Sequence, residues 1–337
     1  MKEVLVMRMS AMGDVAMTVP VIASVLTQHP DVHITMLSDP RFADMFAGLD
    51  RLTFVGVDKK NDYKGLLGIF KLFRHLRKNY KFDLFVDLHD VLRSQVLRTL
   101  YRLTGLKISV IDKGRAEKKA LIAAAPSERK QLISSFERYR IAFEKAGLPT
   151  TISFNGLNIE TDGYDQSVRY IGVAPFAQHA GKIYPLDKMK EVVKQLAQRP
   201  QTHIFLFGGG KKEKETMENW VSELSAEGLT NVESLVGKCK GLKEEMKKMK
   251  QCKVMISMDS ANMHIASLVG TPVVSVWGAT HPYAGFYGFN QNPANAVQLD
   301  MDCRPCSVFG NKPCKKGNYP CLNGIAPETI VDLSCEQ

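Results

Sequence analysis

Short apolar runs alternate with amphipathic stretches along most of this chain. Apolar runs bounded by turn residues are typical of strands buried on both faces of a parallel sheet. Between them, apolar residues recur every three or four positions, which predicts helices that cover such a sheet. In the first half, the predicted strands are Val4–Met7, Val32–Leu37, Leu52–Val57, Leu84–Leu88 and Ile108–Ile111, and the predicted helices are Val15–Gln28, Pro40–Phe46, Lys64–Asn79, Leu92–Leu103 and Lys130–Ala146.

The same alternation restarts after residues 150–168, a stretch rich in Gly, Asp and Asn that predicts a linker. Strand–helix repeats of this kind predict an α/β protein with doubly wound parallel sheets. We therefore expect two Rossmann-like domains facing a central cleft, formed by residues 1–160 and 161–337. In the second half, the predicted strands are Tyr170–Ala174, His203–Phe207, Val254–Ser257 and Val273–Trp277, and the predicted helices are Leu186–Arg199, Lys212–Ser225, Leu242–Lys250 and Asn262–Val269.

Three strand ends in the second half carry residues suited to a phosphate-bearing ligand. Asp259 and Ser260 follow one strand and begin a helix, whose free amides bind phosphate or carboxylate well. Lys182 follows another strand, and the three glycines at 208–210 follow a third and let a ligand approach the backbone. Simpler explanations are a plain helix cap at Asp259, a packed core side chain for His264 and an ordinary tight turn at the glycines.

The first strand leads to an acidic residue, Asp14, through the sequence RMSAMGD. Neither the glycine pattern of dinucleotide-binding folds nor that of a phosphate-binding loop follows this strand, which argues against a dinucleotide reductase or a P-loop enzyme. A carboxylate at the carboxyl end of a central strand can take a proton from a substrate hydroxyl. The alternative for Asp14 is a helix cap.

Composition and charge narrow the class of protein. The chain has 337 residues, of which 45% are hydrophobic, as expected for globular domains with full cores. No apolar run approaches the roughly 18 residues of a membrane span, and the amino terminus reads as a first strand and not a secretory signal. We therefore expect a cytoplasmic protein.

The net charge of +10 is concentrated in one region. Residues 59–145 contain 21 Lys and Arg against 9 Asp and Glu, a net charge of +12, so the rest of the chain carries about −2. Such a basic region indicates an anionic partner, such as a phosphorylated substrate, an anionic membrane surface or nucleic acid. Solvated helix faces are the simpler explanation for any single cation.

Two segments, RMSAMGDVAMTVPVIASV and DSANMHIASLVGTPVVSVWGAT, resemble glycosyltransferase family 9, the heptosyltransferases of lipopolysaccharide core assembly, which have the GT-B fold. Gly181-Lys182-Ile183-Tyr184-Pro185 and the glycine turn fit the same family, as does the cysteine-rich tail. The family usually has Gly before its His-bearing helix, where this chain has Ala261, and the loop 176–179 lacks the hydroxyl residues of many relatives.

The resemblance implies an inverting, metal-independent transfer from a nucleotide-activated sugar. The donor would be an ADP-sugar, typically ADP-heptose, and no cofactor would be required for catalysis. The acceptor would be a lipid-linked anionic saccharide, met at the cytoplasmic face of the inner membrane, and no nucleic acid partner is expected. The implied catalytic residues are Asp14, as general base, and Lys182, near the donor phosphates; the implied donor-binding residues are Gly208, Gly209, Gly210, Glu213, Asp259, Ser260, Ala261, Asn262 and His264.

The basic region then has a specific use in binding the acceptor. The stretch 64–81 predicts a basic amphipathic helix that can rest on an anionic membrane surface, although a core-packed helix with a solvated basic face is the simpler explanation. The expected acceptor-binding residues are Ser10, Gly13, Arg93, Arg98, Arg115, Lys118 and Lys119.

Four cysteines gather near the carboxyl end, at Cys303, Cys306, Cys314 and Cys321. A Cys-x2-Cys pair with two more cysteines nearby is one pattern of a structural zinc site, although the later spacings are not standard. Unligated thiols or a local disulfide are the alternatives. The Asp300-Met301-Asp302 sequence matches the DxD of metal-dependent glycosyltransferases, and we interpret it as a chance match outside the strand-end sites.

Other functions remain as alternatives to heptose transfer. A glycosyltransferase of the same fold with a different nucleotide-sugar fits the same residues. A nucleic-acid-binding α/β protein would use the basic region, but no basic sheet face interleaved with aromatic residues is visible. Another two-domain nucleotide-sugar enzyme, such as an epimerase, is the remaining alternative.

Overall fold

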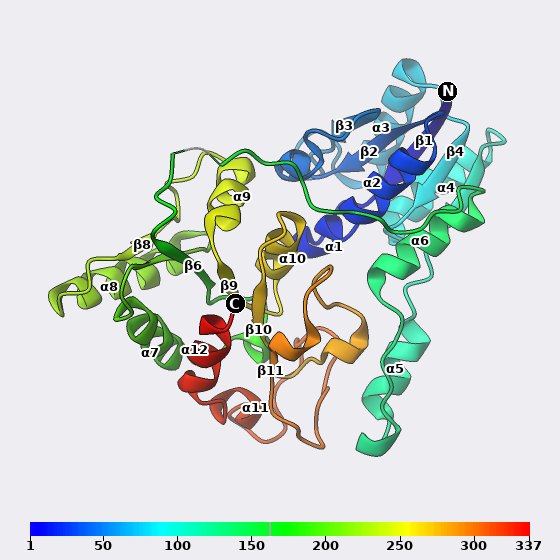
Figure 1. Cartoon of the computed structure of the whole chain (residues 1–337). Coiled ribbons are helices and arrows are strands. Elements are labelled where there is room, and N and C mark those ends of the chain that lie inside the picture. The colour runs from blue at the N-terminus through cyan, green and yellow to red at the C-terminus, as the bar shows by residue number, and fades with distance from the viewer. Residues whose placement is uncertain (162) are drawn as a thin grey trace. The chain divides into compact units, whose positions relative to one another are not determined.

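The computed structural model describes residues 1–161 and 163–337, and its chain packs into two compact units (Figure 1). The first unit comprises Met1–Lys113 and Ser135–Asn155, and the second comprises Gly114–Ser134 and Gly156–Gln337. The chain therefore enters the second unit near residue 155, and an earlier segment, Gly114–Ser134, also packs with the second unit. Within the predicted linker, residue 162 lies outside the described residues.

The first unit is built on a five-stranded parallel sheet in the order β3-β2-β1-β4-β5. The residues of β1 from Val4 to Met7 are all fully buried, as expected for a central strand covered on both faces. The strands are β1 (Lys2–Met7), β2 (Val32–Ser38), β3 (Leu52–Gly56), β4 (Leu84–Asp87) and β5 (Lys107–Val110).

Helices cover this sheet in two pairs, α2 with α6 and α3 with α4. Alternate residues of β1 point to opposite faces, so Leu5 and Met7 share one apolar core with Ile69 and Leu72 of α3. The first-unit helices are α1 (Met12–Ala16), α2 (Val19–Gln28), the 3-10 helix η1 (Pro40–Phe46), α3 (Gly65–Asn79), α4 (Leu92–Arg102) and α6 (Ser135–Lys145).

The second unit has a six-stranded parallel sheet in the order β11-β10-β9-β6-β7-β8. Its strands are β6 (Arg169–Ala174), β7 (Thr202–Leu206), β8 (Val232–Ser234), β9 (Val254–Met258), β10 (Val273–Val276) and β11 (Ala296–Val297). Helix α7 packs with α12, and α9 packs with α10. The helices are α5 (Arg115–Ala123), α7 (Leu186–Ala197), α8 (Lys211–Ala226), α9 (Leu242–Gln251), α10 (Ala261–Leu268), α11 (Pro320–Asn323) and α12 (Pro327–Cys335), with 3-10 turns η2 (Pro126–Glu128), η3 (Ala180–Lys182), η4 (Pro282–Ala284) and η5 (Pro293–Asn295).

The predicted helix Val15–Gln28 is wrong in one respect, because the chain breaks it into α1 and α2. Pro20 lies in the first turn of α2 and has no N–H to donate to the carbonyl of Ala16, so a single helix would lose that bond. The Thr18 hydroxyl instead donates to the carbonyl of Val15 at the break.

The predicted helix Lys130–Ala146 begins later than expected, at Ser135. Residues before it run without helical structure, and the Leu132 amide donates to the carbonyl of Tyr283 over 2.9 Å. This bond lies within the second unit and holds the end of the Gly114–Ser134 segment there. The predicted acceptor-binding residues of α5 thus belong to the second packed unit.

None of the helices in the described residues combines the length and apolar character needed to cross a bilayer.

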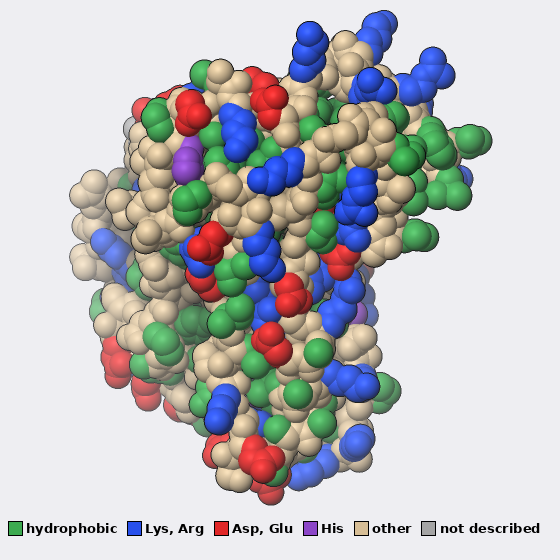
Figure 2. All heavy atoms as spheres, turned by 90° about the vertical axis from the view of Figure 1, so that its right-hand side faces the viewer, with side chains coloured by type: hydrophobic (Ala, Val, Ile, Leu, Met, Phe, Trp, Pro, Cys, Tyr) green, Lys and Arg blue, Asp and Glu red, His purple; other side chains and the backbone are tan. Residues whose placement is uncertain are grey.

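Figure 2 shows Lys and Arg side chains over one face of the molecule and hydrophobic side chains that project at its upper edge.

Candidate functional sites at the two sheet switch points

In the first sheet, the strand order reverses between β1 and β4, which are adjacent, with Met7 in register with Asp87. In open parallel sheets, ligands bind outside the carboxyl ends of the strands at such a reversal point. Asp14, a predicted site residue, follows the loop after β1. His89, which was not predicted, lies in the loop after β4, at the same edge of the sheet.

The Asp14 carboxylate is held by an ion pair with Arg8, whose Nη2 lies 2.6 Å from Asp14 Oδ2. The same oxygen accepts the Ala11 amide over 3.1 Å. Asp14 is the third residue of α1, so this bond supports the start of the helix, as one alternative proposed. The Tyr139 hydroxyl donates to the Asp14 carbonyl over 3.2 Å. Both ends of the residue are therefore fixed.

Arg8 is itself almost fully buried and is held by the loop after β4. Its Nη1 donates to the carbonyl of Leu88 over 2.7 Å, and its own carbonyl accepts the Ser38 hydroxyl. A guanidinium with such fixed partners orients a carboxylate more strictly than a flexible lysine would. Arg8 was part of the quoted opening segment but was not predicted as a site residue.

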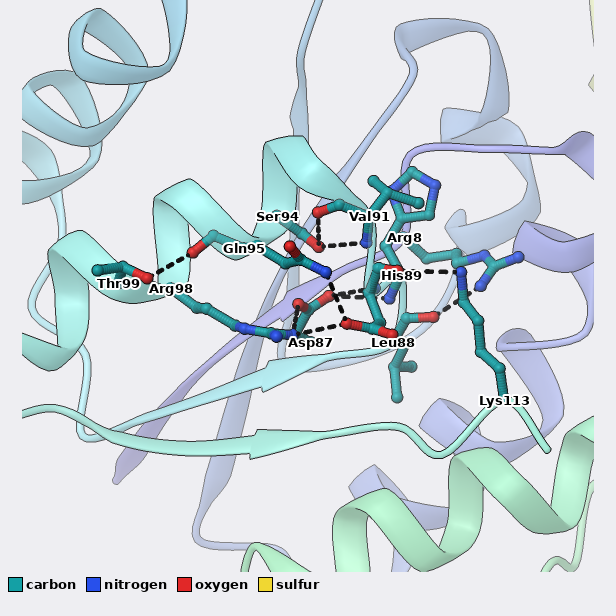
Figure 3. Close-up of polar contacts among 11 residues, drawn as sticks. Arg8, Asp87, Leu88, His89, Val91, Ser94, Gln95, Arg98, Thr99 and Lys113 are labelled. Carbon is teal, nitrogen blue, oxygen red and sulfur yellow. Dashed lines mark hydrogen bonds and ion pairs between the residues drawn. The ribbon is translucent and has the colours of Figure 1, made fainter. Parts of the chain in front are cut away.

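The loop after β4 is organised around Asp87 (Figure 3). One carboxylate oxygen accepts the amides of His89 and Asp90, and the other accepts Arg98 Nη1 over 2.9 Å. Arg98 also pairs with Asp90 over 3.0 Å. Its predicted role in acceptor binding is untested, and the structure shows that it already has two carboxylate partners.

His89 lies in this loop, beside Arg8 from the loop after β1 and Lys113 from the loop after β5 (Figure 3). Its Nδ1 accepts the Met9 amide over 3.4 Å. Burial, together with the positive charges of Arg8 and Lys113, lowers the pKa of His89 to about 3. The imidazole is therefore neutral near pH 7 and acts here as a hydrogen-bond acceptor.

The remaining predicted acceptor-binding residues lie on different elements: the loop after β1, α1, α4 and α5. Ser10 is in the loop after β1, where Lys59 Nζ lies 3.4 Å from its hydroxyl, and Gly13 is in α1. Arg93 donates to the carbonyl of Tyr63 over 2.7 Å. On α5 are Arg115, Lys118 and Lys119, and the buried Lys118 places Nζ 4.3 Å from the centre of the Phe286 ring.

In the second sheet, the strand order reverses between β6 and β9. The loop after β6 carries Lys182, the loop after β9 carries Asp259, and the two form an ion pair with Nζ 2.8 Å from Oδ2. Thr280, after β10, donates its hydroxyl to the same oxygen over 2.8 Å. Asp259 is only 4% exposed. Its carboxylate therefore links three strand ends and does not cap α10.

Helix α10 begins directly after this ion pair with Ser260 as its N-cap residue. The Ser260 side chain makes no capping bond to the helix and lies instead 3.2 Å from the Ser257 hydroxyl. The amides predicted to bind phosphate, those of Ser260, Ala261 and Asn262, thus stand at the carboxyl end of β9. His264 is buried in α10, one turn further along.

The glycine turn after β7 is braced by Glu213, whose carboxylate accepts the Gly209 amide over 2.8 Å. A side chain at Gly208 would come within 2.5 Å of the Met217 methyl group, which explains glycine there. Gly210 has a positive φ of 83° and starts α8. Glu213 has a local structural role, and its role in donor binding stays a prediction.

Close backbone packing surrounds Lys182. A Cβ on Gly181 would lie 2.8 Å from the carbonyl oxygen of Gly310, and one on Gly310 would lie 2.7 Å from Lys182 Cγ. The Ala279 amide donates to the Gly181 carbonyl over 2.8 Å. The cysteine-rich segment and the loop after β10 thus pack directly on the loop that carries Lys182.

Buried Arg304 ties the cysteine-rich segment to the end of β10. Its guanidinium donates to the carbonyl of Thr280 over 3.0 Å, so the segment is linked to the residue that bonds Asp259. Arg304 was not predicted as a site residue, because its place in the sequence carries no signal that it is buried. The other acceptors of its guanidinium are the carbonyls of Trp277, Gly278 and Leu299 and the side chain of Gln298.

The possible zinc site is not formed in the part of the chain that the structure describes, where no three His, Cys, Asp or Glu side chains are placed to hold a metal ion. Cys321 faces the apolar core of the second unit, and burial raises the pKa of its thiol to about 11. The Cys306 thiol donates to the carbonyl of Ala279. Cys303 and Cys314 are likewise free thiols, and in the Asp300–Asp302 sequence the carbonyl of Asp302 accepts Arg129.

Residues 69–317 match the family model described as glycosyltransferase family 9 (heptosyltransferase). This match covers well over half of the chain. The chain belongs to glycosyltransferase family 9. The family resemblance of the two quoted segments is therefore confirmed, and the protein is a glycosyltransferase.

Individual relatives agree with the family assignment. The chain is 24% identical over 288 residues to the lipopolysaccharide core heptosyltransferase OpsX of Haemophilus influenzae, which covers 83% of this chain and 80% of that protein. The crystal structure of a family 9 glycosyltransferase from Veillonella parvula superimposes with a TM-score of 0.77 at 20% identity, covering 100% of this chain and 98% of that one. For the Escherichia coli ADP-heptose lipopolysaccharide heptosyltransferase II, the TM-score is 0.73 at 18% identity, covering 100% and 99%. The predicted GT-B fold is confirmed.

Proposed function

We propose that this family 9 glycosyltransferase transfers heptose from ADP-heptose to a lipopolysaccharide core acceptor with inversion at the anomeric carbon. The family match, and the names of OpsX and heptosyltransferase II, support the sugar and the acceptor class. A glycosyltransferase that uses another nucleotide-sugar is the alternative that the test below separates.

The Lys182–Asp259–Thr280 cluster is the observation that carries the donor side of this proposal. As the glycosidic bond to the nucleotide breaks, negative charge grows on the departing diphosphate. Fixed cations and amides that are already oriented stabilise such charge without reorganisation. Lys182 is 15% exposed and is held by the buried Asp259, so its ammonium is oriented before the donor binds. The amides at the start of α10 would bind the diphosphate, as helix starts do.

Asp14 carries the acceptor side as general base. It would accept the proton of the attacking acceptor hydroxyl while the new bond forms between that oxygen and the anomeric carbon. The bond from this carbon to the diphosphate oxygen breaks, and ADP leaves with the electron pair. Arg8 would act as a positioning residue, because its ion pair and the Ala11 amide fix the direction of the carboxylate.

In this proposal, Lys182 and the amides at the start of α10 stabilise the charge on the departing diphosphate, and no metal ion takes part. The other donor residues, Glu213 and the glycine turn, would meet the nucleoside, and the basic side chains of the first half of the chain would meet the phosphates and acidic sugars of the acceptor. We propose that this acceptor is reached from the cytoplasmic side of the inner membrane by a peripherally bound enzyme.

Calorimetric titration with ADP, UDP, GDP and CMP tests the donor. Clear preference for ADP is expected, followed by ADP release when ADP-heptose and a heptose-deficient lipopolysaccharide core are supplied together. Preference for UDP or GDP would support a glycosyltransferase that uses another nucleotide-sugar and would exclude ADP-heptose as the donor. Absence of binding to all four nucleotides would overturn the site at α10.

A further inference from the structure

Among the residues that the structure describes, the outward face of α3 carries large apolar side chains that are exposed. Its inward face, with Ile69, Leu72 and Leu76, packs into the core of the first unit. On the opposite side, Leu67 is 85% exposed and Phe70 is 47% exposed. Scattered apolar residues are common on surfaces, but a group at the end of one helix marks an interaction site.

The group extends beyond the helix. Leu66, in the first turn of α3, is 59% exposed, and Leu92, the first residue of α4, is 72% exposed. Arg93 bonds the carbonyl of Tyr63, just before α3, and α3 packs with α4, so the starts of the two helices lie together. We call Leu66, Leu67, Phe70 and Leu92 the apolar tip.

Cations surround the apolar tip. Residues 63–82 contain no Asp or Glu, and every Lys and Arg in this stretch is exposed. Figure 2 shows a gathering of this kind, with hydrophobic side chains projecting at the upper edge beside several Lys and Arg side chains. The exposed cations are Lys64, Lys71, Arg74, Arg77, Lys78 and Lys81.

We propose that the apolar tip and these cations form a docking surface for the headgroup region of an anionic lipid bilayer. Apolar side chains enter the boundary between headgroups and acyl chains, while cations beside them pair with lipid phosphates. A second copy of the chain is a poorer occupant, because two such basic faces would repel each other. This surface deepens the proposed function, and its use in catalysis rests on that function, since a lipid-linked acceptor lies in such a bilayer.

Sedimentation of the full chain with phosphatidylcholine vesicles, with or without about a third of phosphatidylglycerol, tests the surface. We expect binding to the anionic vesicles, little binding to the neutral ones, and loss of binding at high salt. The double variant Leu66→Ser/Leu67→Ser should bind at least about tenfold more weakly. The variant Lys71→Gln/Arg74→Gln should lose about fivefold for each charge.

Matched controls are Leu103→Ser, which changes a leucine that is 81% exposed at the far end of α4, and Lys315→Gln/Lys316→Gln, which removes two exposed lysines of the second unit. Neither should alter vesicle binding. Binding to neutral vesicles that is as strong as binding to anionic ones would overturn the proposal, as would losses in the controls as large as those in the test variants. Binding to DNA that the Leu66→Ser/Leu67→Ser variant retains would also overturn it.

ADP titration of the same variants separates this surface from the donor site. Vesicle binding is measured without nucleotide, so a protein that binds anionic vesicles but no ADP would refute the proposed donor and leave the docking surface standing. ADP binding without any vesicle binding would refute the docking surface alone.

Discussion

The Lys182 ammonium and the Asp259 carboxylate form a 2.8 Å ion pair that joins the loop after β6 to the loop after β9. Lys182→Ala removes the cation and leaves a buried carboxylate with the Thr280 hydroxyl as partner. Since a charged hydrogen bond contributes about 1.5–3 kcal/mol, the Kd for ADP should rise about tenfold or more. Calorimetry with ADP measures this change.

The control for that variant is Lys190→Ala, which breaks an ion pair of similar length, 2.6 Å, on the exposed surface of α7. It should leave ADP affinity unchanged and alter the free energy of unfolding by less than about 1 kcal/mol. Equal effects of the two substitutions on ADP affinity would remove Lys182 from the donor site.

Asp14→Asn keeps the size of the side chain and removes its basicity. If Asp14 is the general base, turnover should fall about a hundredfold or more, with donor affinity retained. Release of ADP in the presence of acceptor measures turnover. Asp31→Asn, at an exposed position of the same unit, is the matched control. A variant with normal turnover would exclude the proposed base.

His89 should make the protein less stable in acid. Its pKa is lowered to about 3 in the folded protein by burial and by the charges of Arg8 and Lys113, whereas in the unfolded chain it is about 6.5. Between these values the unfolded state binds more protons, so the free energy of unfolding falls as the pH drops below about 6.5. From pH 7.5 to pH 5 the loss attributable to His89 is about 2 kcal/mol.

Denaturant titrations at the two pH values measure this loss. His281, whose pKa is also lowered by burial, to about 4, contributes in the same direction, so the comparison is between the parent protein and His89→Gln. The variant should lose about 2 kcal/mol less on acidification. An identical loss in both proteins would show that His89 is protonated in the folded state.

Arg304→Lys should destabilise the second unit. Lysine cannot reproduce the fork that donates to several carbonyls around Thr280, so buried acceptors lose their partners, at a cost of about 3 kcal/mol or more. Chemical denaturation measures the change, and ADP affinity should fall with it because Thr280 bonds Asp259. Arg41→Lys changes an arginine whose side chain is 74% exposed and should cost less than about 1 kcal/mol.

Most of the fold follows from the pattern of apolar residues. Buried strands such as β1 and β9 are continuous apolar runs bounded by turn signals, so their positions were predicted to within two residues. The strands β8 and β11 were not predicted, because runs of three and two residues are too short to show a pattern of apolar residues. The break between α1 and α2 was missed because the apolar pattern continues across it.

The sites were predictable only in part. Strand ends in a parallel sheet converge, so Asp14, Lys182 and Asp259 were found from their position and from the family resemblance. Their partners were not, since the ion pairs with Arg8 and between Lys182 and Asp259 depend on side-chain directions that periodicity does not encode. Polar residues between strands, such as Arg304, carry no local signal of burial.

The placement of Gly114–Ser134 in the second unit has a consequence for how the protein is made. The first unit needs α6, because α6 packs on α2. As the chain leaves the ribosome, residues 1–155 can close this unit while Gly114–Ser134 still waits for the partners it contacts, such as Tyr283 and Phe286. A fragment that ends at residue 160 would leave Gly114–Ser134 without these partners, and residues 161–337 alone would lack the segment. A single cut in the gene therefore cannot give the two units of this enzyme as two complete proteins.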